Sequence, residues 1–198
     1  MIRQTSGSFP FRNGFFILFI LLCASWQQKD TGKLVSVKVA EMLNVKVPET
    51  FQKLNDDQIA DKIIASRKPL VMYSSPSGTA DFSVSVGNSS KNPWQDKDLK
   101  LMAEFQKANI RQLFTSVDFI QDKQVKIKGH QFWAFEFVSE VKEKGKPPIR
   151  KYNNVRYAIH KKNMLIFSFI CAEAERPVYR GLSEQILGSI KLYTYQSF

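Results

Sequence analysis

His130 and His160 are the only two histidines in the chain, so any imidazole chemistry near neutral pH depends on them. An imidazole that a carboxylate orients can activate a serine hydroxyl as a nucleophile. Folding would have to bring Ser74 or Ser116 to one of these rings, because the sequence has no G-x-S-x-G elbow. Both histidines adjoin predicted turns, so we expect them to be polar turn residues. If the fold did assemble a histidine-based site, the protein would be a small envelope hydrolase, which is the alternative to a non-catalytic binding role.

Other reactive arrangements are missing from the sequence. It has no HExxH or CxxC motif for zinc and no GxGxxG loop for phosphate. Cys171 lies in an apolar run, where a thiol behaves as a small hydrophobic side chain. Acid pairs at 56–57 and at Asp96 and Asp98 stand where helices are predicted to begin, so we expect helix capping rather than acid–base catalysis. The sequence predicts no metal, no cofactor and no enzymatic activity.

The start of the chain is typical of a secretory signal peptide, with a basic beginning and an apolar run at residues 15–24. A helix of that length spans ~15 Å, about half of the ~30 Å hydrocarbon core of a bilayer. We therefore expect residues 1–25 to be removed by cleavage near Ala24 or Ser25. Residues 26–33 then form a short tether.

Alternatives for this segment stay open. One is an uncleaved N-terminal membrane anchor or a buried helix. The other is lipidation at Cys23, although a small residue usually precedes such a cysteine and Leu22 stands there. The preferred interpretation, a cleaved leader, predicts an exported protein, periplasmic or secreted, and lipidation would anchor that protein to a membrane.

The chain is strongly basic, with 29 lysines and arginines against 18 acidic residues and a net charge of +11. Loss of Arg3 and Arg12 with the leader leaves 27 basic residues against 18 acidic ones, a charge of +9. Such a charge favours anionic partners, including peripheral contact with a membrane surface. Nucleic acid is not expected, because the chain carries an export signal and no recognisable nucleic-acid-reading motif.

Candidate binding residues gather at one predicted hairpin around Pro147 and Pro148. Trp94, in a loop at a helix entrance, is a further candidate, since an exposed aromatic side chain can anchor a partner. Its alternative role is to cover one end of the core. The basic hairpin residues are Lys142, Lys144, Lys146, Arg150 and Lys151.

Hydrophobic periodicity predicts one α+β domain over residues 34–193, followed by a tail at 194–198. Helices are predicted from Asp56, over 96–114 and from Arg176. Strands are predicted at 34–47 (as one strand, or as two broken near Glu41), 70–73, 81–86, 117–128, 131–141, 152–159 and 164–172.

Three packing expectations follow from these patterns. The apolar run 164–172 is expected to be a central strand buried on both faces. The aromatic strand at 132–137 should place one face against a helix, with its other face either covered or open as a groove. The long helix is expected to bury Leu99, Met102, Phe105, Ile110, Leu113 and Phe114.

Several landmarks together resemble a known family. They are a proline-terminated strand at 44–48, a hairpin at 71–82, the strand entry at 129–133, the turn at 160–163 and a terminal helix that ends at 186–190. This order resembles the PsbP-like α/β/α sandwich, which the photosystem extrinsic subunit, the Ran-binding Mog family and exported DcrB-like bacterial proteins share. The resemblance implies a layered, mostly antiparallel sheet flanked by helices, and a binding or accessory role without catalysis.

The sequence therefore predicts an exported, non-catalytic accessory or binding protein of the bacterial cell envelope. It would contact another envelope protein or an anionic partner through a groove or a basic face. The resemblance carries no site residue onto this chain, because binding sites differ between branches of the family.

Overall fold

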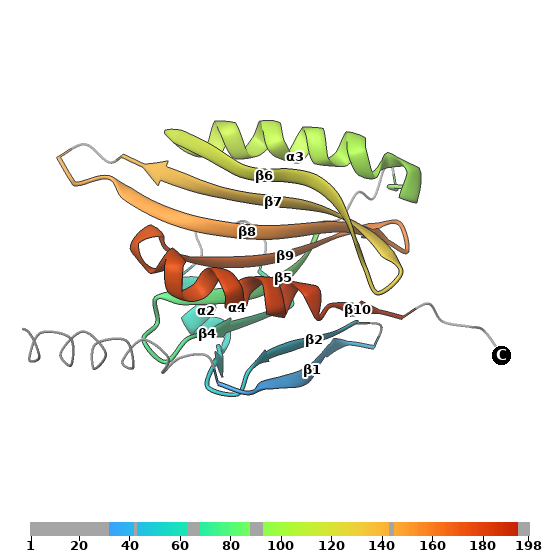
Figure 1. The fold of residues 1–198 in the computed structure, drawn as a ribbon, viewed down its shortest axis with the longest axis horizontal. Coiled ribbons are helices and arrows are strands. Elements are labelled where there is room, and N and C mark those ends of the chain that lie inside the picture. Colours follow the sequence, from blue (N-terminus) through green and yellow to red (C-terminus); the bar gives the residue numbers. More distant parts are fainter. Residues whose placement is uncertain (1–31, 42, 63–67, 88–92, 143–144, 194–198) are drawn as a thin grey trace, which may run out of the picture.

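The computed structural model describes residues 32–41, 43–62, 68–87, 93–142 and 145–193. The predicted leader with Cys23, the basic residue Lys144 and the predicted tail lie outside the described residues. Helices and two antiparallel sheets form stacked layers (Figure 1), so the α+β sandwich predicted from the sequence is confirmed.

The larger sheet has seven strands in the order β3-β4-β5-β9-β8-β7-β6, and all of its pairs are antiparallel. The long hairpins in its second half follow from the strong alternation of apolar and polar residues there. Its strands are β3 (Gln52–Lys53), β4 (Val71–Ser74), β5 (Ala80–Gly87), β6 (Ser116–Ile127), β7 (His130–Val141), β8 (Ile149–His160) and β9 (Asn163–Ala172).

Two tight turns at one end of this sheet connect β6 with β7 and β8 with β9. Lys128 and Gly129 have φ values of 45° and 91°, and Lys161 and Lys162 have φ values of 49° and 66°. Two-residue turns with positive φ match the right-handed twist of the strands that they join. These turns set the register of the four long strands.

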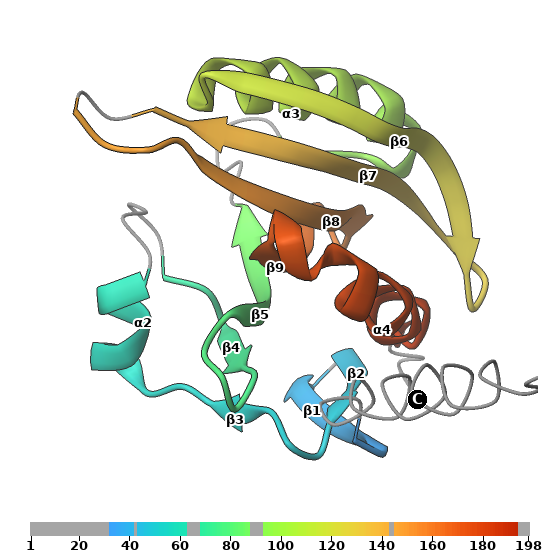
Figure 2. The same cartoon turned by 60° about the vertical axis from the view of Figure 1, so that its left-hand side comes forward.

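Helices cover both faces of the seven-stranded sheet. Helix α3 (Leu99–Leu113), which a 3-10 turn at Asp96–Asp98 precedes, packs on β6, β7 and β8. Helix α4 (Arg176–Gly188) packs on the other face against β8 and β9, with Pro177 in its first turn. The short helix α2 (Asp56–Lys62) lies beside β4 (Figure 2).

A second sheet lies on the far side of α4. It consists of β1 (Leu34–Ala40), β2 (Leu43–Pro48) and β10 (Lys191–Leu192), in the order β1-β2-β10. Val45 and Val47 of β2 join Ile186 and Leu187 of α4 and Phe167 of β9 in one buried cluster. Helix α4 is thus enclosed between two sheets (Figure 2).

The strands of this second sheet were predicted in part. The break in the first predicted strand near Glu41 is confirmed, because β1 and β2 form a hairpin there. Strand β10 was not predicted, because two residues are too short to show a period.

Two packing expectations were wrong. Strand β9 is central, but its side chains alternate between buried and half-buried, because α3 lies over β6 to β8 and leaves the second face of β9 partly open. On α3, Phe105 is 55% exposed and Leu113 is 73% exposed. The buried stripe of α3 runs through Leu99, Met102, Ala103 and Ile110.

The packing of α4 gives the first prediction. Ile186 is fully buried, whereas its neighbour Gln185 is exposed. Ile186→Ala should cost about 2–5 kcal/mol of unfolding free energy, because it leaves a cavity between the two sheets. The melting temperature, measured by circular dichroism, should fall by about 4–20 °C. Gln185→Ala is the matched control and should leave it nearly unchanged. Equal small losses for both variants would mean that α4 is not docked as described.

Candidate functional site

The two histidines meet at the end of the sheet that carries the tight turns. Their ring centroids are 6.1 Å apart, with planes at 84°. Burial lowers the pKa of His160, and the nearby His130 and Lys161 lower it further. A hollow of about 210 Å³ beside them is lined by Asp96, Leu99, Gln124, Gly129, His130, Gln131 and Ile159.

The two serines considered for a histidine-based site lie far from these rings. Ser116 pairs with Glu140, ten residues along β7 from His130, which corresponds to ~34 Å. Ser74 accepts a hydrogen bond from Lys62 Nζ at 3.0 Å, and the register places it level with Asn153, about 23 Å along β8 from His160. The structure therefore does not assemble a serine–histidine pair from these residues.

Other candidate groups have structural roles. Burial raises the pKa of the Cys171 thiol to about 12, so this cysteine stays protonated and is a poor nucleophile. The Asp98 carboxylate accepts a hydrogen bond from the Gln95 N–H at 2.9 Å, which is the predicted capping role. Within the described part of the chain, no cluster of three or more metal-binding side chains occurs.

Two hollows and several charged side chains lie along one side of α4, where it faces the strands β6, β7 and β8. We call this surface the α4 groove and define it by Lys123, Glu136, Arg156, Arg180 and Glu184. One hollow in it, of about 170 Å³, is lined by Gln121, Lys123, Val125, Ile127, Arg156, Glu184 and Gly188. A second, of about 370 Å³, lies at the start of α4 and is lined by Glu173, Arg176, Pro177 and Arg180.

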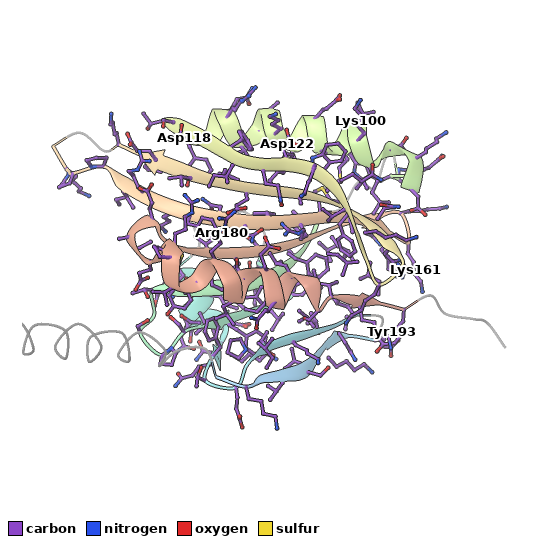
Figure 3. The ribbon with its side chains drawn as sticks, in the orientation of Figure 1. Lys100, Asp118, Asp122, Lys161, Arg180 and Tyr193 are labelled. Atoms are coloured by element: carbon purple, nitrogen blue, oxygen red, sulfur yellow. The ribbon has the colours of Figure 1, made fainter. Side chains whose placement is uncertain are left out.

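Glu136 forms a buried anionic point in this groove, although it lies on a strand of aromatic residues. The residue is 1% exposed. Its Oε1 accepts a hydrogen bond from Tyr152 Oη at 3.1 Å and lies 2.8 Å from Arg180 Nε, and its Oε2 accepts a hydrogen bond from Arg180 Nη2 at 3.3 Å. Figure 3 shows Arg180 between α4 and the sheet. Burial raises the pKa of Tyr152 to about 12, and the Glu136 carboxylate adds to this rise, so the tyrosine stays neutral.

Arg156 forms the matching buried cation and is 4% exposed. Its Nη2 donates to both carboxylate oxygens of Glu184, at 3.0 and 2.8 Å, and its Nη1 donates to Asn154 Oδ1 at 2.6 Å. Asn154 in turn donates to Ser183 Oγ at 2.9 Å. These hydrogen bonds hold one positive and one negative group at fixed places in the groove.

The layered fold of this chain resembles solved protein structures, although its sequence is not similar to a known family. No family model and no curated protein matches the sequence. Solved structures do match: cyanobacterial PsbP (CyanoP) from Synechocystis, with a TM-score of 0.53 and 12% identity over 82% of this chain and 94% of that one. The fold is PsbP-like. At such identity the likeness shows the fold alone.

Two further structures share the PsbP-like fold. The Ran-binding protein Mog1p of Saccharomyces cerevisiae matches with a TM-score of 0.55 and 13% identity, over 81% of this chain and 96% of that one. LpqN of Mycobacterium tuberculosis, described as involved in cell envelope biogenesis, matches with a TM-score of 0.50 and 10% identity, over 86% and 96%.

The basic hairpin of this PsbP-like domain does not present one continuous patch. Lys142 and Arg150 lie on the α4 side of the sheet, whereas Lys151 follows Arg150 on β8 and so points to the opposite face. Lys146 is exposed near the hairpin tip. Trp94 lies at the other end of the sheet, half-buried against the core under α3. The structure therefore brings Lys142 and Arg150 together but leaves Lys151 and Trp94 apart from them.

Carboxylates neutralise much of the hairpin's charge. Arg150 donates to Glu173 at 2.5 and 3.1 Å and to Glu140 at 3.1 Å, and Lys142 Nζ lies 3.1 Å from Glu140. The hydrogen bond from Arg150 lowers the pKa of Glu173, and those from Lys142 and Arg150 lower the pKa of Glu140. The sequence places Glu140 among these cations, but it does not indicate that Glu173 reaches Arg150 from outside the hairpin.

Sequence analysis also missed the groove charges. Glu136 stands between Phe135 and Phe137 in a predicted strand, and Arg156 stands between Val155 and Tyr157. A charged residue within such a strand signals either an exposed face or a buried ion pair. The partner from α4 could not be assigned without the fold.

The Glu136–Arg180 pair gives the second prediction. Arg180→Ala should cost about 1–3 kcal/mol of unfolding free energy, since it leaves a buried carboxylate without its cation, and the half-exposed arginine warrants the low end. Adding Glu136→Gln to Arg180→Ala should recover part of this loss in urea melts, because position 136 then carries no unpaired buried charge. A double variant as unstable as the single one would contradict the pairing.

The Arg150 cluster gives the third prediction, which concerns acid. An unfolded glutamate titrates near ~4.3, and Glu140 and Glu173 have lower pKa values in the fold. The contribution of these two carboxylates to the free energy of unfolding is therefore fully present above pH ~4.3. It is lost as the pH falls through their lower pKa values in the folded protein. Arg150→Gln should be less stable than the wild type at neutral pH, and the gap in melting temperature should close on acidification.

The control for the acid prediction is Lys151→Gln, which removes an adjacent positive charge from the opposite face of the sheet. Its melting temperature should differ little from the wild type at any pH. A gap between Arg150→Gln and the wild type that stays constant down to pH ~3 would contradict the assignment.

Proposed function

We propose that this PsbP-like protein is an exported, non-catalytic accessory protein of the bacterial cell envelope. It binds a protein partner through the α4 groove, with Lys142 and Arg150 at the hairpin end of that groove. The apolar run at residues 15–24 supports export, with cleavage near Ala24 or Ser25.

The observation that carries this proposal is that two ion pairs in the groove have fixed positions. Arg156 with Glu184, and Glu136 with Arg180, are held by hydrogen bonds before any partner arrives. A preset arrangement lowers the cost of ordering side chains on association. Each charge already has a stabilising counterpart, which suits recognition rather than proton transfer.

The exposed members of these two ion pairs indicate which kinds of side chain a partner would carry. The Arg180 side chain is 51% exposed and the Glu184 side chain is 45% exposed, while Lys123 of β6 is exposed at the opposite wall. A partner segment that carries both acidic and basic side chains would complement this alternation. Because these contacts would be between charged side chains, such a complex would be sensitive to salt.

The structural neighbours are consistent with this role by analogy of fold. Mog1p is described as Ran-binding, and LpqN as involved in cell envelope biogenesis. Function resides in the site rather than in the fold, so the α4 groove carries the argument and the analogy only agrees with it.

The fourth prediction tests the groove. Lys123→Glu combined with Lys142→Glu reverses two exposed cations on the α4 side, and should reduce capture of the native envelope partner about tenfold or more. Capture is measured by cross-linking in intact envelopes followed by purification and quantitative mass spectrometry. The same change should flatten the salt dependence of capture, while the circular dichroism melt stays near that of the wild type.

Two controls sharpen this test. Lys97→Glu with Lys100→Glu makes the same charge change at the α3 side and should leave capture unchanged. His130→Ala with His160→Ala should also leave function unchanged. Loss of function in the histidine variant, with normal capture in the groove variant, would favour the hydrolase alternative instead.

A further inference from the structure

The outer face of the β1-β2-β10 sheet carries lysines without carboxylates. Lys38, Lys46 and Lys191 come from three different strands and are all exposed. None of the residues of these strands is acidic. Among the ion pairs of the described residues, none includes any of the three lysines, in contrast to Lys142 and Arg150 at the hairpin.

The strand register places these lysines close together on one face. Lys38 pairs with Asn44, Asn44 pairs with Lys191, and Lys46 lies two residues along β2 from Asn44. Residues in these positions point to the same side of a sheet, and the three are therefore within ~10 Å of one another. This spacing is close to the ~8 Å Debye length at physiological salt, so the lysines act together on an anionic surface.

The opposite face of the same sheet packs on α4, so the lysines point away from the molecule. Val45 and Val47 fill the core on the inner side, and β1 and β2 form the outermost layer of the described structure (Figure 1). Tyr193 adds an aromatic ring to the lysine side, because Asn44 Nδ2 donates to its hydroxyl at 3.2 Å and Lys191 Nζ lies 4.6 Å from its ring centroid. Tyrosine and lysine both suit the boundary between water and lipid.

From this face we infer that the β1-β2-β10 sheet docks on anionic lipid headgroups. Charge complementarity supports lipid as the occupant, because Lys38, Lys46 and Lys191 face outward together from three strands that contain no acidic residue, and Tyr193 lies beside them. A bilayer surface with anionic lipid presents many negative charges in one plane, which several lysines on one face can contact at once.

The described part of the chain has no helix with the length and apolar character needed to cross a membrane. The docking inferred here is contact of the lysine face with the surface of the bilayer. It does not depend on the α4 groove, which lies on another side of α4 and uses other residues.

The fifth prediction tests the lipid face with the purified mature chain and sedimentation against vesicles. The wild type should bind phosphatidylcholine vesicles that contain phosphatidylglycerol, bind pure phosphatidylcholine much more weakly, and lose binding at high salt. Each lysine near an anionic surface contributes about fivefold in partitioning, so Lys38→Gln, Lys46→Gln and Lys191→Gln together should lower it about a hundredfold. Soluble glycerol phosphate should not displace the wild type.

The matched control is Lys97→Gln, Lys100→Gln and Lys151→Gln, which removes the same charge from other exposed positions. It should retain most of the binding, and both triple variants should keep the melting temperature of the wild type. Failure of the wild type to bind the anionic vesicles would overturn the inference. An equal loss in both triple variants would also overturn it, since net charge rather than this face would then explain binding.

Dye fluorescence at two positions tests which face of the protein contacts the vesicles. A fluorescent dye on Ser36→Cys, which lies among the lysines on β1, should shift to the blue with anionic vesicles, whereas a dye on Lys100→Cys should not. Cys171 is buried and does not compete for the dye. A shift at Lys100 alone would contradict the docking face. Capture of the envelope partner should persist in the lipid-face variant, so the two proposals fail separately.

Discussion

The packing of α4 between two sheets is the constraint on which the rest of this structure depends. Ile186 and Leu187 are fully buried, and they join β9 on one side to β2 on the other. A helix with apolar contacts on two sides has only a narrow polar stripe left. In this domain that stripe carries Arg180 and Glu184, so the same packing that encloses α4 also aims its charged residues at the neighbouring strands.

The charged residues beside α4 show how this domain holds buried ions next to its core. Burying an isolated charge costs free energy, because the charge loses its hydration. This cost is offset only when hydrogen bonds and an opposite charge surround the buried group. Arg156 meets that condition with Glu184, Asn154 and a backbone carbonyl. The strands provide Glu136 and Arg156, and α4 supplies their partners Arg180 and Glu184.

The sequence predicted the parts of this fold whose signals are local. The alternation in β6 to β9, the proline and glycine turns and the helix starts each depend on neighbours within a few residues, and these elements are where the sequence places them. The landmarks around them also sufficed for a resemblance to the PsbP-like fold. Phe105 and Leu113 were misplaced because a loose helical pattern fits more than one phase, and only the packed sheet selects the stripe that is buried.

The site was less predictable, because its partners are distant in the chain. Arg180 and Glu136 are 44 residues apart, and Arg156 and Glu184 are 28 residues apart. The basic hairpin looked like one patch in the sequence, since charge clusters are counted along the chain. A β-strand sends neighbouring residues such as Arg150 and Lys151 to opposite faces, and Glu173 arrives from another element to neutralise one of them.

Strand β6 ends the seven-stranded sheet, so one side of its twelve-residue backbone has no partner strand in the described structure. A long unpaired edge is a template on which another chain can assemble. The register of β6 shifts between Phe119 and Gln121, and an irregular backbone spacing cannot continue a straight ladder. Beyond this shift, Lys123 and Lys126 place charged side chains along the edge. The register shift and these lysines are the features by which natural edge strands disfavour pairing with a second copy.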